Sequence, residues 1–388
     1  MINIKSKKEC CGCQACASVC AHRAITMQAD AEGFLYPMID KDACTFCGLC
    51  EQVCPVIHQV PPHQPLKVYA ARSNDEELRR QSSSGGIFTL LAEAVIREGG
   101  IVFGAKFNEE WNVIHAWTES IDGLAAFRGS KYVQSTIGNT YKEAKEFLLQ
   151  GRKVLYTGTP CQIAGLKRYL RKDYENLLTA DIICHGVPSP LVWQKQLDQM
   201  RAKGEITSIS FRDKTYGWSQ YAFRLSYIPT TAGTSKEQTL LIPRSENAFM
   251  RGFLADLYLR PSCHDCPARR GKSNSDITLG DFWGIQHVFP KLSDNKGCSA
   301  ILIHSTKGQI FYNKLKRTDI ESNYECILSE NPSLEYNPKQ TIYARRFWRK
   351  FPQQGLRCIS SICNQRNILN IKSQYFKIKR ALLRLLKR

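Results

Sequence analysis

Long apolar segments are missing from this chain of 388 residues. It contains no run of about eighteen apolar residues, the length that a membrane-spanning helix needs. The opening stretch, MINIKSKKECC, also lacks the apolar core of a secretory signal peptide. Because thiols stay reduced in the cytoplasm, we expect the 17 cysteines to be free thiols or metal ligands of a cytoplasmic protein, not disulfides.

Negative charge is missing from the C-terminal part. After Glu335 there is no acidic residue, whereas Lys339 and thirteen basic residues from Arg345 onward follow. Removing these 14 charges from the formal net charge of +19 leaves about +5 on the rest of the chain. The basicity therefore belongs to a tail, and a protein that binds nucleic acid with its whole body is not expected.

Two common nucleotide-binding motifs are also absent. The chain has no G-x-G-x-x-G, and the triplet Gly271-Lys272-Ser273 lacks the glycine that a P-loop places five residues earlier, because Cys266 stands there. A nicotinamide-binding Rossmann domain and a Walker-type NTPase are therefore not supported.

Two dense cysteine runs near the start are the clearest motif that is present. Both have the spacing C-x2-C-x2-C-x3-C, which is the pattern of a bacterial ferredoxin with two [4Fe–4S] clusters. In that pattern the fourth cysteine of each run ligates the other cluster. All-thiolate zinc sites are the alternative, but zinc does not need cysteines packed this closely. We expect one cluster on Cys10, Cys13, Cys16 and Cys54, and a second on Cys44, Cys47, Cys50 and Cys20.

The remaining chain predicts an α+β or α/β multidomain protein. We expect a ferredoxin-like domain over residues 1–58, a proline-rich linker over 59–66, α/β regions over 67–150 and 151–340, and a basic tail over 341–388. Strands, glycine-containing loops and helices follow one another in the βαβ manner. The expected strands cover residues 67–71, 101–107, 113–118, 153–156, 178–184, 206–211, 221–227, 239–241, 276–279 and 300–303, and the expected helices cover residues 85–98 (capped by Ser84), 141–149, 162–170, 190–201 and 245–259.

A second group of cysteines lies at the predicted ends of these elements. Cys161 begins a helix, Cys184 ends a strand, and Cys263 and Cys266 form a C-x2-C pair on a loop. Because βαβ folds gather ligands at such ends, the four thiolates are candidates for a third cluster. The alternative from residue types alone is that Cys184 is a small buried apolar residue and Cys161 a thiol in a turn.

Six short motifs in this order resemble one family, that of the beta subunit of coenzyme F420 hydrogenase/dehydrogenase. The resemblance covers roughly residues 1 to 310. The motifs are Ser83-Ser-Gly-Gly86, Gly129-Ser-Lys-Tyr-Val-Gln-Ser135, Gly158-Thr-Pro-Cys-Gln162, Cys184-His-Gly186, Cys263-His-Asp-Cys266 and Ser275-Asp-Ile-Thr-Leu-Gly-Asp-Phe-Trp-Gly284.

The resemblance implies an FAD-binding protein fed by iron–sulfur clusters. It implies that residues 67–150 form the N-terminal type of flavin-binding region and residues 151–340 the C-terminal type, and that the four later cysteines hold a third [4Fe–4S] cluster near the flavin. Lys131 and His185 are the candidate catalytic residues, Lys131 to stabilise negative charge and His185 to donate a proton. The flavin-binding residues it implies are Ser84, Gly85, Gly86, Lys131, Tyr132, Gln134, Gly158 and Thr159.

The tail predicts an amphipathic cationic helix. Apolar residues recur at gaps of three and four from Ile368 to Leu385, with lysines and arginines between them. Such a helix packs on the body or docks on an anionic membrane surface or an acidic protein partner. These alternatives stay open, and peripheral attachment at the inner membrane surface is among them.

Together these observations predict a cytoplasmic iron–sulfur flavoprotein oxidoreductase. We expect electrons to pass from a ferredoxin-like donor through the clusters to FAD, and then to an unidentified small-molecule substrate that takes two electrons. A deazaflavin (coenzyme F420) oxidoreductase and an electron-relay subunit without a substrate of its own are the alternatives.

Overall fold

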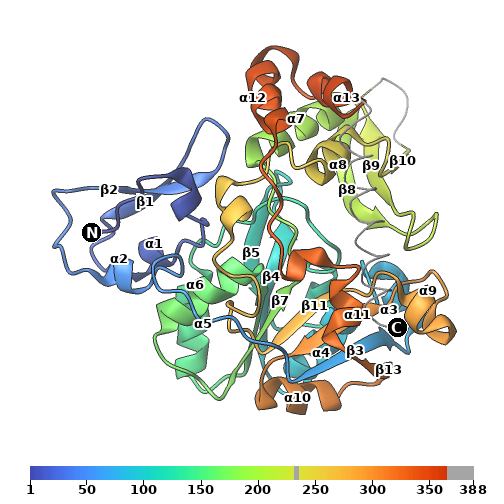
Figure 1. Cartoon of the computed structure of the whole chain (residues 1–388), viewed down its shortest axis with the longest axis horizontal. Helices are drawn as coiled ribbons and strands as arrows, with labels where there is room; N and C mark the ends of the chain where they lie inside the picture. Colours follow the sequence, from blue (N-terminus) through green and yellow to red (C-terminus); the bar gives the residue numbers. More distant parts are fainter. Residues whose placement is uncertain (231–235, 365–388) are drawn as a thin grey trace.

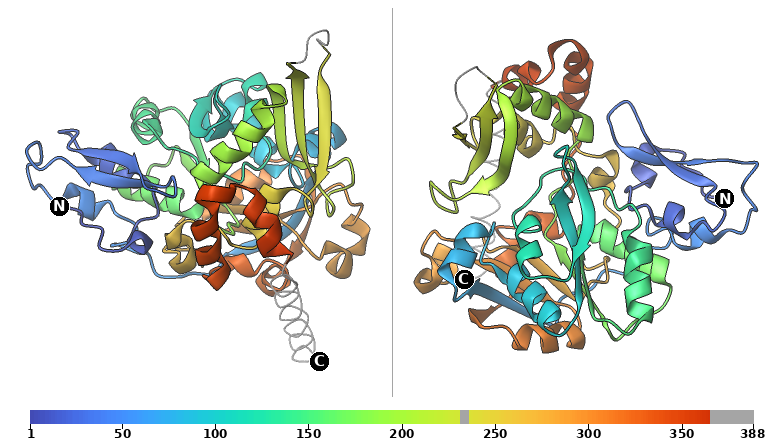
Figure 2. Two further views of the ribbon diagram at one scale, coloured as in Figure 1. Left: turned by 90° about the horizontal axis from the view of Figure 1, so that it is seen from above. Right: turned by 180° about the vertical axis from the view of Figure 1, so that it is seen from behind.

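A computed structural model describes residues 1–230 and 236–364 of the chain (Figure 1). A small N-terminal domain lies at one side of a larger α/β body, and a second, smaller sheet lies beside helices from the C-terminal part (Figures 1 and 2). The predicted mixed α/β multidomain architecture is confirmed. Within the described ranges, no helix is long and apolar enough to cross a membrane.

The N-terminal domain contains a two-stranded antiparallel sheet and short helices. Cys16 lies in helix α1 and Cys50 in helix α2, so each of these helices belongs to one of the two cysteine runs. The elements are β1 (Ile25–Ala29), β2 (Leu35–Ile39), α1 (Ala15–Val19), α2 (Leu49–Gln52) and the 3-10 helix η1 (Lys7–Glu9).

The body is built on one mixed sheet, which in the described residues has the strand order β13-β3-β12-β11-β7-β6-β4-β5. The strands β4, β6, β7 and β11 pair in parallel, as the βαβ pattern predicts, whereas β5, β12, β3 and β13 are joined to the sheet by antiparallel pairing. The strands are β3 (Lys67–Ser73), β4 (Ile101–Phe107), β5 (Val113–Thr118), β6 (Val154–Gly158), β7 (Leu177–Ile182), β11 (Ile277–Asp281), β12 (Ser299–Ile303) and β13 (Arg317–Ser322).

Helices cover both faces of this sheet because successive side chains of a strand point to opposite sides. In β4, Ile101 and Phe103 pack with α5 and α6, whereas Val102 packs with α4 on the other face. The helices are α3 (Glu76–Gln81), α4 (Ile87–Arg97), α5 (Thr140–Leu149), α6 (Pro160–Leu170), α9 (Ile285–Val288), α10 (Thr306–Asn313) and α11 (Tyr324–Leu328), with 3-10 helices η2 (Asp122–Ala126), η3 (Pro261–Asp265), η4 (Pro290–Leu292) and η5 (Pro332–Leu334).

The second sheet is antiparallel and packs with four helices in an apolar core to which Val113 of β5 also belongs. Its strand order is β10-β9-β8. Phe211, Phe223 and Phe249 are buried in this core together with Trp193. The elements are β8 (Gly204–Asp213), β9 (Ala222–Pro229), β10 (Gln238–Pro243), α7 (Pro190–Arg201), α8 (Ala248–Leu254), α12 (Ile342–Gln354) and α13 (Arg357–Cys363).

The helices α12 and α13 belong to the region that the sequence assigns to a basic tail. Phe347 and Ile359 are fully buried in the core of the second sheet, so this part of the tail packs on the body. The apolar series from Ile368 to Leu385, on which the predicted amphipathic helix rests, lies outside the described residues.

Two local predictions about helices are wrong. Ser84 does not cap α4, because the N-cap is Gly86 in a left-handed conformation (φ +89°) and the Ser84 hydroxyl instead donates to the Cys298 carbonyl, at 3.0 Å. The helix expected over residues 245–259 is shorter: α8 ends at Leu254, and Asp256 adopts a left-handed φ of +59° that a helix cannot continue.

Candidate redox centres and cofactor cavity

The first predicted cluster set comes together in the structure. Burial and the negative charges of Cys10 and Cys54 raise the pKa of the Cys16 thiol to about 12. Burial also raises the pKa of Cys54, with a contribution from Cys10. The pKa of Cys13 is raised as well: a hydrogen bond from Cys11 lowers it, but burial and the charges of Cys16 and Cys54 raise it more. The fourth cysteine of the second run therefore lies beside the first three of the first run, as crossed ligation of two clusters requires.

Two cysteines of the second predicted set lie in space beside the first residues of the chain. The backbone N–H of Ile2 donates to the sulfur of Cys50, at 3.3 Å. The charges of Cys50 and Cys44 contribute to a raised pKa of the N-terminal amino group, whose largest cause is its hydrogen bond to Glu51. Cys20 packs with Cys50 in one apolar cluster, and Cys47 is exposed.

Among the described residues, no three Cys, His, Asp or Glu side chains converge closely enough to hold one metal ion.

The four later cysteines share the wall of a small cavity of about 50 Å³, although they come from distant parts of the sequence. Cys161 is the second residue of α6, Cys184 lies two residues beyond β7, and Cys263 and Cys266 lie in and just after η3. The prediction that Cys184 ends its strand is thus off by two residues. The fold nevertheless gathers all four thiols.

The electrostatics of these four thiols fit a thiolate-bound metal centre. Burial and the charge of Cys266 raise the pKa of Cys263 to about 12, and burial with the charge of Cys263 raises that of Cys184. Arg269 acts in the opposite direction on both. Thiols this close would ionise together only around a positive centre, which iron would supply, because metal binding displaces thiol protons.

Cys11 lies between the cysteines of the N-terminal domain and the four later cysteines of the body. It is 4% exposed and also lines the small cavity. Its pKa is raised well above the ordinary value, first by a hydrogen bond with Cys13, and its thiol also hydrogen-bonds Cys161. One buried residue thus touches a cysteine of the N-terminal domain and a cysteine of the body, which places the two groups next to each other.

A cavity of about 1070 Å³ adjoins the four later cysteines. Cys184, Gly186 and Val187 line both cavities. Small-molecule and cofactor sites have volumes of roughly 300–1,000 Å³, so this space accommodates a large cofactor. Six of the eight predicted cofactor residues line it, namely Ser84, Gly86, Lys131, Tyr132, Gly158 and Thr159.

The other two predicted cofactor residues lie elsewhere. The Gly85 N–H donates to the Ser299 hydroxyl at 2.9 Å, and a Cβ at Gly85 would approach the Ala71 carbonyl oxygen to 2.4 Å, so Gly85 allows close packing of the loop on the sheet. The Gln134 amide donates to the Cys11 carbonyl and accepts from Arg260, both at 3.0 Å. Gln134 therefore joins the N-terminal domain to the body.

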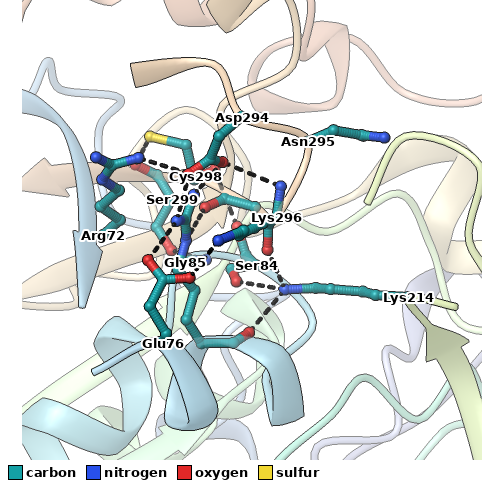
Figure 3. A network of polar contacts seen from close by, with 12 residues as sticks. Arg72, Glu76, Ser84, Gly85, Lys214, Asp294, Asn295, Lys296, Cys298 and Ser299 are labelled. Atoms are coloured by element: carbon teal, nitrogen blue, oxygen red, sulfur yellow. Dashed lines mark hydrogen bonds and ion pairs between the residues drawn. The ribbon is translucent and has the colours of Figure 1, made fainter. Parts of the chain in front are cut away.

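The serine loop over residues 82–86 is held at the cavity by a half-buried lysine. The Lys214 ammonium donates to the carbonyl oxygens of Ser84 and Arg79, each at 2.8 Å, and to that of Lys296 at 2.7 Å (Figure 3). Arg79 in turn forms an ion pair with Asp294. This network, from three separate segments, fixes the backbone that Ser84 and Gly86 present to the cavity.

The two predicted catalytic residues line the same cavity. Lys131 is half-buried, its ammonium donates to the carbonyls of Ala126 and Arg128 at 2.9 Å, and desolvation lowers its pKa to about 7. The Nε2 of His185 lies 2.6 Å from Oδ1 of Asp256, whose carboxylate is fully buried. Asp256 thus orients the His185 ring.

Sequence reasoning missed two arginines that line the cavity. Arg212 and Arg244 both line it, with the rings of Tyr221 and Trp283. Arg212 is buried and pairs with Asp281 at 2.8 Å. An arginine next to a strand end is common in any sequence, and no spacing rule marks it as part of a site.

These groupings define a class: the chain is an iron–sulfur protein of the oxidoreductase type, with paired N-terminal cysteine runs and a cofactor-sized cavity behind them. It belongs to the family of the coenzyme F420 hydrogenase/dehydrogenase beta subunit. The model of the family's N-terminal part matches residues 68–141 and that of its C-terminal part residues 151–323, while a 4Fe-4S dicluster domain matches residues 9–57.

Curated relatives and a solved structure carry related names. One subunit of the F(420)H(2) dehydrogenase of Methanosarcina mazei is 27% identical over 190 residues, which cover 45% of this chain and 53% of that protein. Coenzyme F420-dependent sulfite reductase of Methanocaldococcus jannaschii is 27% identical over 189 residues, which cover 47% of this chain and 28% of that protein. The chain thus spans about half or less of the length of these relatives.

A chain of the xenon-derivatised F420-reducing [NiFe] hydrogenase complex from Methanosarcina barkeri is 18% identical, with 75% of this chain and 90% of that chain covered and a TM-score of 0.44. A likeness of this degree supports no argument about the present chain.

Proposed function

We propose that the chain is an iron–sulfur flavoprotein oxidoreductase that passes electrons between a ferredoxin-like donor and a two-electron substrate. One observation carries this proposal: Cys11 of the N-terminal domain and the four later cysteines line one small cavity, which shares lining residues with the large cavity. Single-electron carriers placed in such a row, ending at a cofactor-sized cavity, suit the transfer of electrons from the surface to a buried reaction site.

FAD is the cofactor that we propose for the large cavity. Bound FAD would supply the conversion between one-electron transfer and two-electron chemistry. The cavity contains what such a ligand needs: aromatic side chains for a planar ring, cations for a pyrophosphate, and the N-terminus of α6 beside Gly158 and Thr159. The Nε atoms of Arg128 and Arg212 are buried without a hydrogen-bond partner, and both residues line the cavity.

The chain's own residues have separate roles in this proposal. Ser84 and Gly86 would hold the cofactor through the backbone that the Lys214 network fixes. Lys131 would place a positive charge against it. His185, oriented by Asp256, would deliver a proton to the substrate. The four later cysteines would hold the third [4Fe–4S] cluster.

An F420 oxidoreductase is the second candidate. It is favoured by the family to which the chain belongs and by the names of both curated relatives. The bleaching of oxidised F420 absorbance by the reduced protein would separate this candidate from an oxidoreductase with another substrate. A third candidate is an electron-relay subunit, since one relative is named as a subunit of a dehydrogenase.

Anaerobic purification followed by counts of iron, sulfide and flavin tests the proposal. Three [4Fe–4S] clusters and one flavin predict about twelve irons and one FAD per chain. About eight irons would remove the third cluster, and protein without FAD that also fails to bind added FAD would remove the flavin. A preparation that contains zinc in place of iron would overturn the whole scheme. We place the protein in the cytoplasm, where such clusters and thiols stay reduced.

A further inference from the structure

One edge of the three-stranded sheet borders the large cavity. In the strand register, Ala222 at the start of β9 pairs with Asp213 at the end of β8 and with Pro243 at the end of β10. The neighbouring residues Arg212, Tyr221 and Arg244 therefore meet at one edge, and all three line the cavity. They belong to a sheet other than the one that carries Ser84 and Gly158.

The two guanidinium groups at this edge share one aromatic ring. The Cζ of Arg212 lies 4.2 Å from the ring centroid of Tyr221, and the Cζ of Arg244 lies 5.2 Å from it. Trp283 adds a second ring at 5.3 Å from Arg212 and is itself stacked on Trp218. Guanidinium groups held against aromatic faces are ordered in position.

Arg212 is oriented before any ligand binds. It donates to both oxygens of Asp281, at 2.8 and 3.2 Å, and to the hydroxyl of Tyr132 at 3.2 Å. Its Nη2 also donates to the carbonyl of Ser83 at 3.2 Å, in the serine loop, while its Nε has no partner. Asp281 neutralises much of its charge, so Arg212 alone does not make an anion site.

Arg244 supplies the charge that remains uncompensated. It is exposed and, among the described residues, forms no ion pair. The cavity as a whole is lined by five cationic side chains against three carboxylates, of which Asp281 pairs with Arg212 and Asp256 with His185. The cations are Arg128, Lys131, Arg212, Arg244 and Lys339, and the acids are Asp256, Asp281 and Glu330.

From this arrangement we propose that Arg212, Tyr221 and Arg244 form an oxyanion subsite that takes a phosphate or carboxylate group. Arginine binds such groups through two parallel N–H bonds, which a lysine cannot reproduce, and Arg244 is the residue to supply them. Arg212 adds its Nε, which has no partner in the protein. The anion comes either from the substrate or from the pyrophosphate of the cofactor. In the first case the inference deepens the proposed function, on which it then rests, because it makes the substrate an anionic molecule.

Inorganic pyrophosphate is the probe that tests this subsite. Equilibrium dialysis with labelled pyrophosphate is carried out on the anaerobically purified full chain, once without and once with saturating FAD. We expect saturable binding to one site per chain, weakened at least tenfold by Arg244→Gln. The variant Arg244→Lys keeps the charge but loses the paired N–H bonds, so we expect intermediate affinity.

Arg201→Gln is the matched control. Arg201 is an exposed arginine at the end of α7 that donates to the Glu110 carbonyl and does not line the cavity, so its variant keeps full affinity. Because Arg244 is exposed, its replacement leaves the fold intact, which the iron count verifies.

Comparison of the dialyses without and with FAD identifies the source of the anion. Binding that persists with FAD bound assigns the subsite to the substrate, and binding that FAD abolishes assigns it to the pyrophosphate of the cofactor. Absent binding in both arms, or equal affinity of wild type and Arg244→Gln, overturns the subsite. The dialysis without FAD needs no flavin, so failure of the subsite and failure of the proposed flavoprotein are distinguishable.

Discussion

Cys11 and Cys161 meet where the N-terminal domain touches the body, and only one of them is a predicted ligand. Both line the small cavity, Cys11 buried and Cys161 partly exposed, and they hydrogen-bond each other. Cys161 belongs to the four cysteines that surround this cavity, whereas Cys11 reaches across from the N-terminal domain. The two thiols therefore offer matched substitutions at nearly the same place.

Cys161→Ser is expected to remove the third cluster. A serine hydroxyl keeps its proton at neutral pH and is a poor iron ligand, so the iron content falls from about twelve to about eight per chain. Iron and sulfide analysis with EPR of the reduced protein measures this loss. The control Cys11→Ser keeps about twelve irons; loss of iron from Cys11→Ser but not from Cys161→Ser would exchange the roles of the two residues.

Lys131 predicts a pH dependence of cofactor binding. Desolvation lowers its pKa to about 7, so the side chain is charged below that pH and loses its charge above it. We expect the dissociation constant of FAD to increase as the pH rises through 7, because the attraction to the phosphates weakens.

Lys131→Met should flatten this pH profile and leave the weaker affinity at all pH values. Lys214 also has a pKa of about 7, lowered by burial, but it does not line the cavity and remains in the variant. Fluorescence titrations of FAD between pH 6 and about 8.5 measure both profiles. A pH step that survives in Lys131→Met would assign it to another group.

At the scale of single elements, most strands and the helices α4 to α7 were predictable because their signals are local, whereas helices such as α3, α10 and α12 were not predicted. The helix α7 begins after the capping residue Ser189 with a proline at its first position, and it was predicted with its observed bounds. The helix α8 was predicted too long because apolar residues continue past Leu254, while the left-handed turn at Asp256 has no composition that marks it.

The difference between local sequence signals and tertiary arrangement also applies to the site. The spacing of the N-terminal cysteines is a local pattern, and the fold brings Cys54 to the first set as that pattern predicts. The gathering of the four later cysteines was predicted from their positions at the ends of elements and strengthened by a family resemblance, and not from their spacing. Arg212 and Arg244 meet only because antiparallel register aligns the ends of β8 and β10, and that register is a tertiary property.

The serine loop gives a prediction at this scale. Gly86 has a φ of +89°, and a Cβ there would lie 2.6 Å from the Leu78 side chain. Gly86→Ala should therefore displace the loop and reduce the FAD content of the protein at least severalfold. The backbone strain of an alanine at this φ should also lower the free energy of unfolding by about 1–2 kcal/mol. Flavin counts and thermal unfolding measure the two effects.

Gly99→Ala is the control that separates the effect of backbone strain from the effect of displacing the serine loop. Gly99 also has a positive φ, +75°, but nothing lies within 4 Å of the position that a Cβ would take there, and it does not line the cavity. We expect a similar decrease in melting temperature with unchanged FAD content. Equal FAD loss in both variants would mean that the loop does not hold the cofactor.

For the whole molecule, Arg260 connects the N-terminal domain to the body. Its fully buried guanidinium donates to the carbonyls of Cys10 and Leu35, each at 2.8 Å, and to Gln134 at 3.0 Å. It also lies over the ring of Tyr36, at 4.5 Å. The position of the N-terminal clusters relative to the cavity thus depends strongly on one side chain.

Arg260→Met should loosen this docking. It leaves buried acceptors without a donor, at a cost of about 1–3 kcal/mol each. We expect faster proteolysis in the linker over residues 59–66 and at least tenfold slower reduction of the flavin by ferredoxin. Arg97→Met is the control, because Arg97 is an exposed residue at the end of α4 that pairs with Glu93 of the same helix. Unchanged electron transfer in Arg260→Met would show that docking does not depend on this residue.

The place of β3 in the large sheet has a consequence for synthesis on the ribosome. This strand follows directly after the linker, yet its two neighbours are β12 and β13, which are translated more than two hundred residues later. Domains fold in the order in which they emerge. The ferredoxin-like segment can therefore mature early, whereas the pocket behind it must wait until nearly the whole polypeptide has been made.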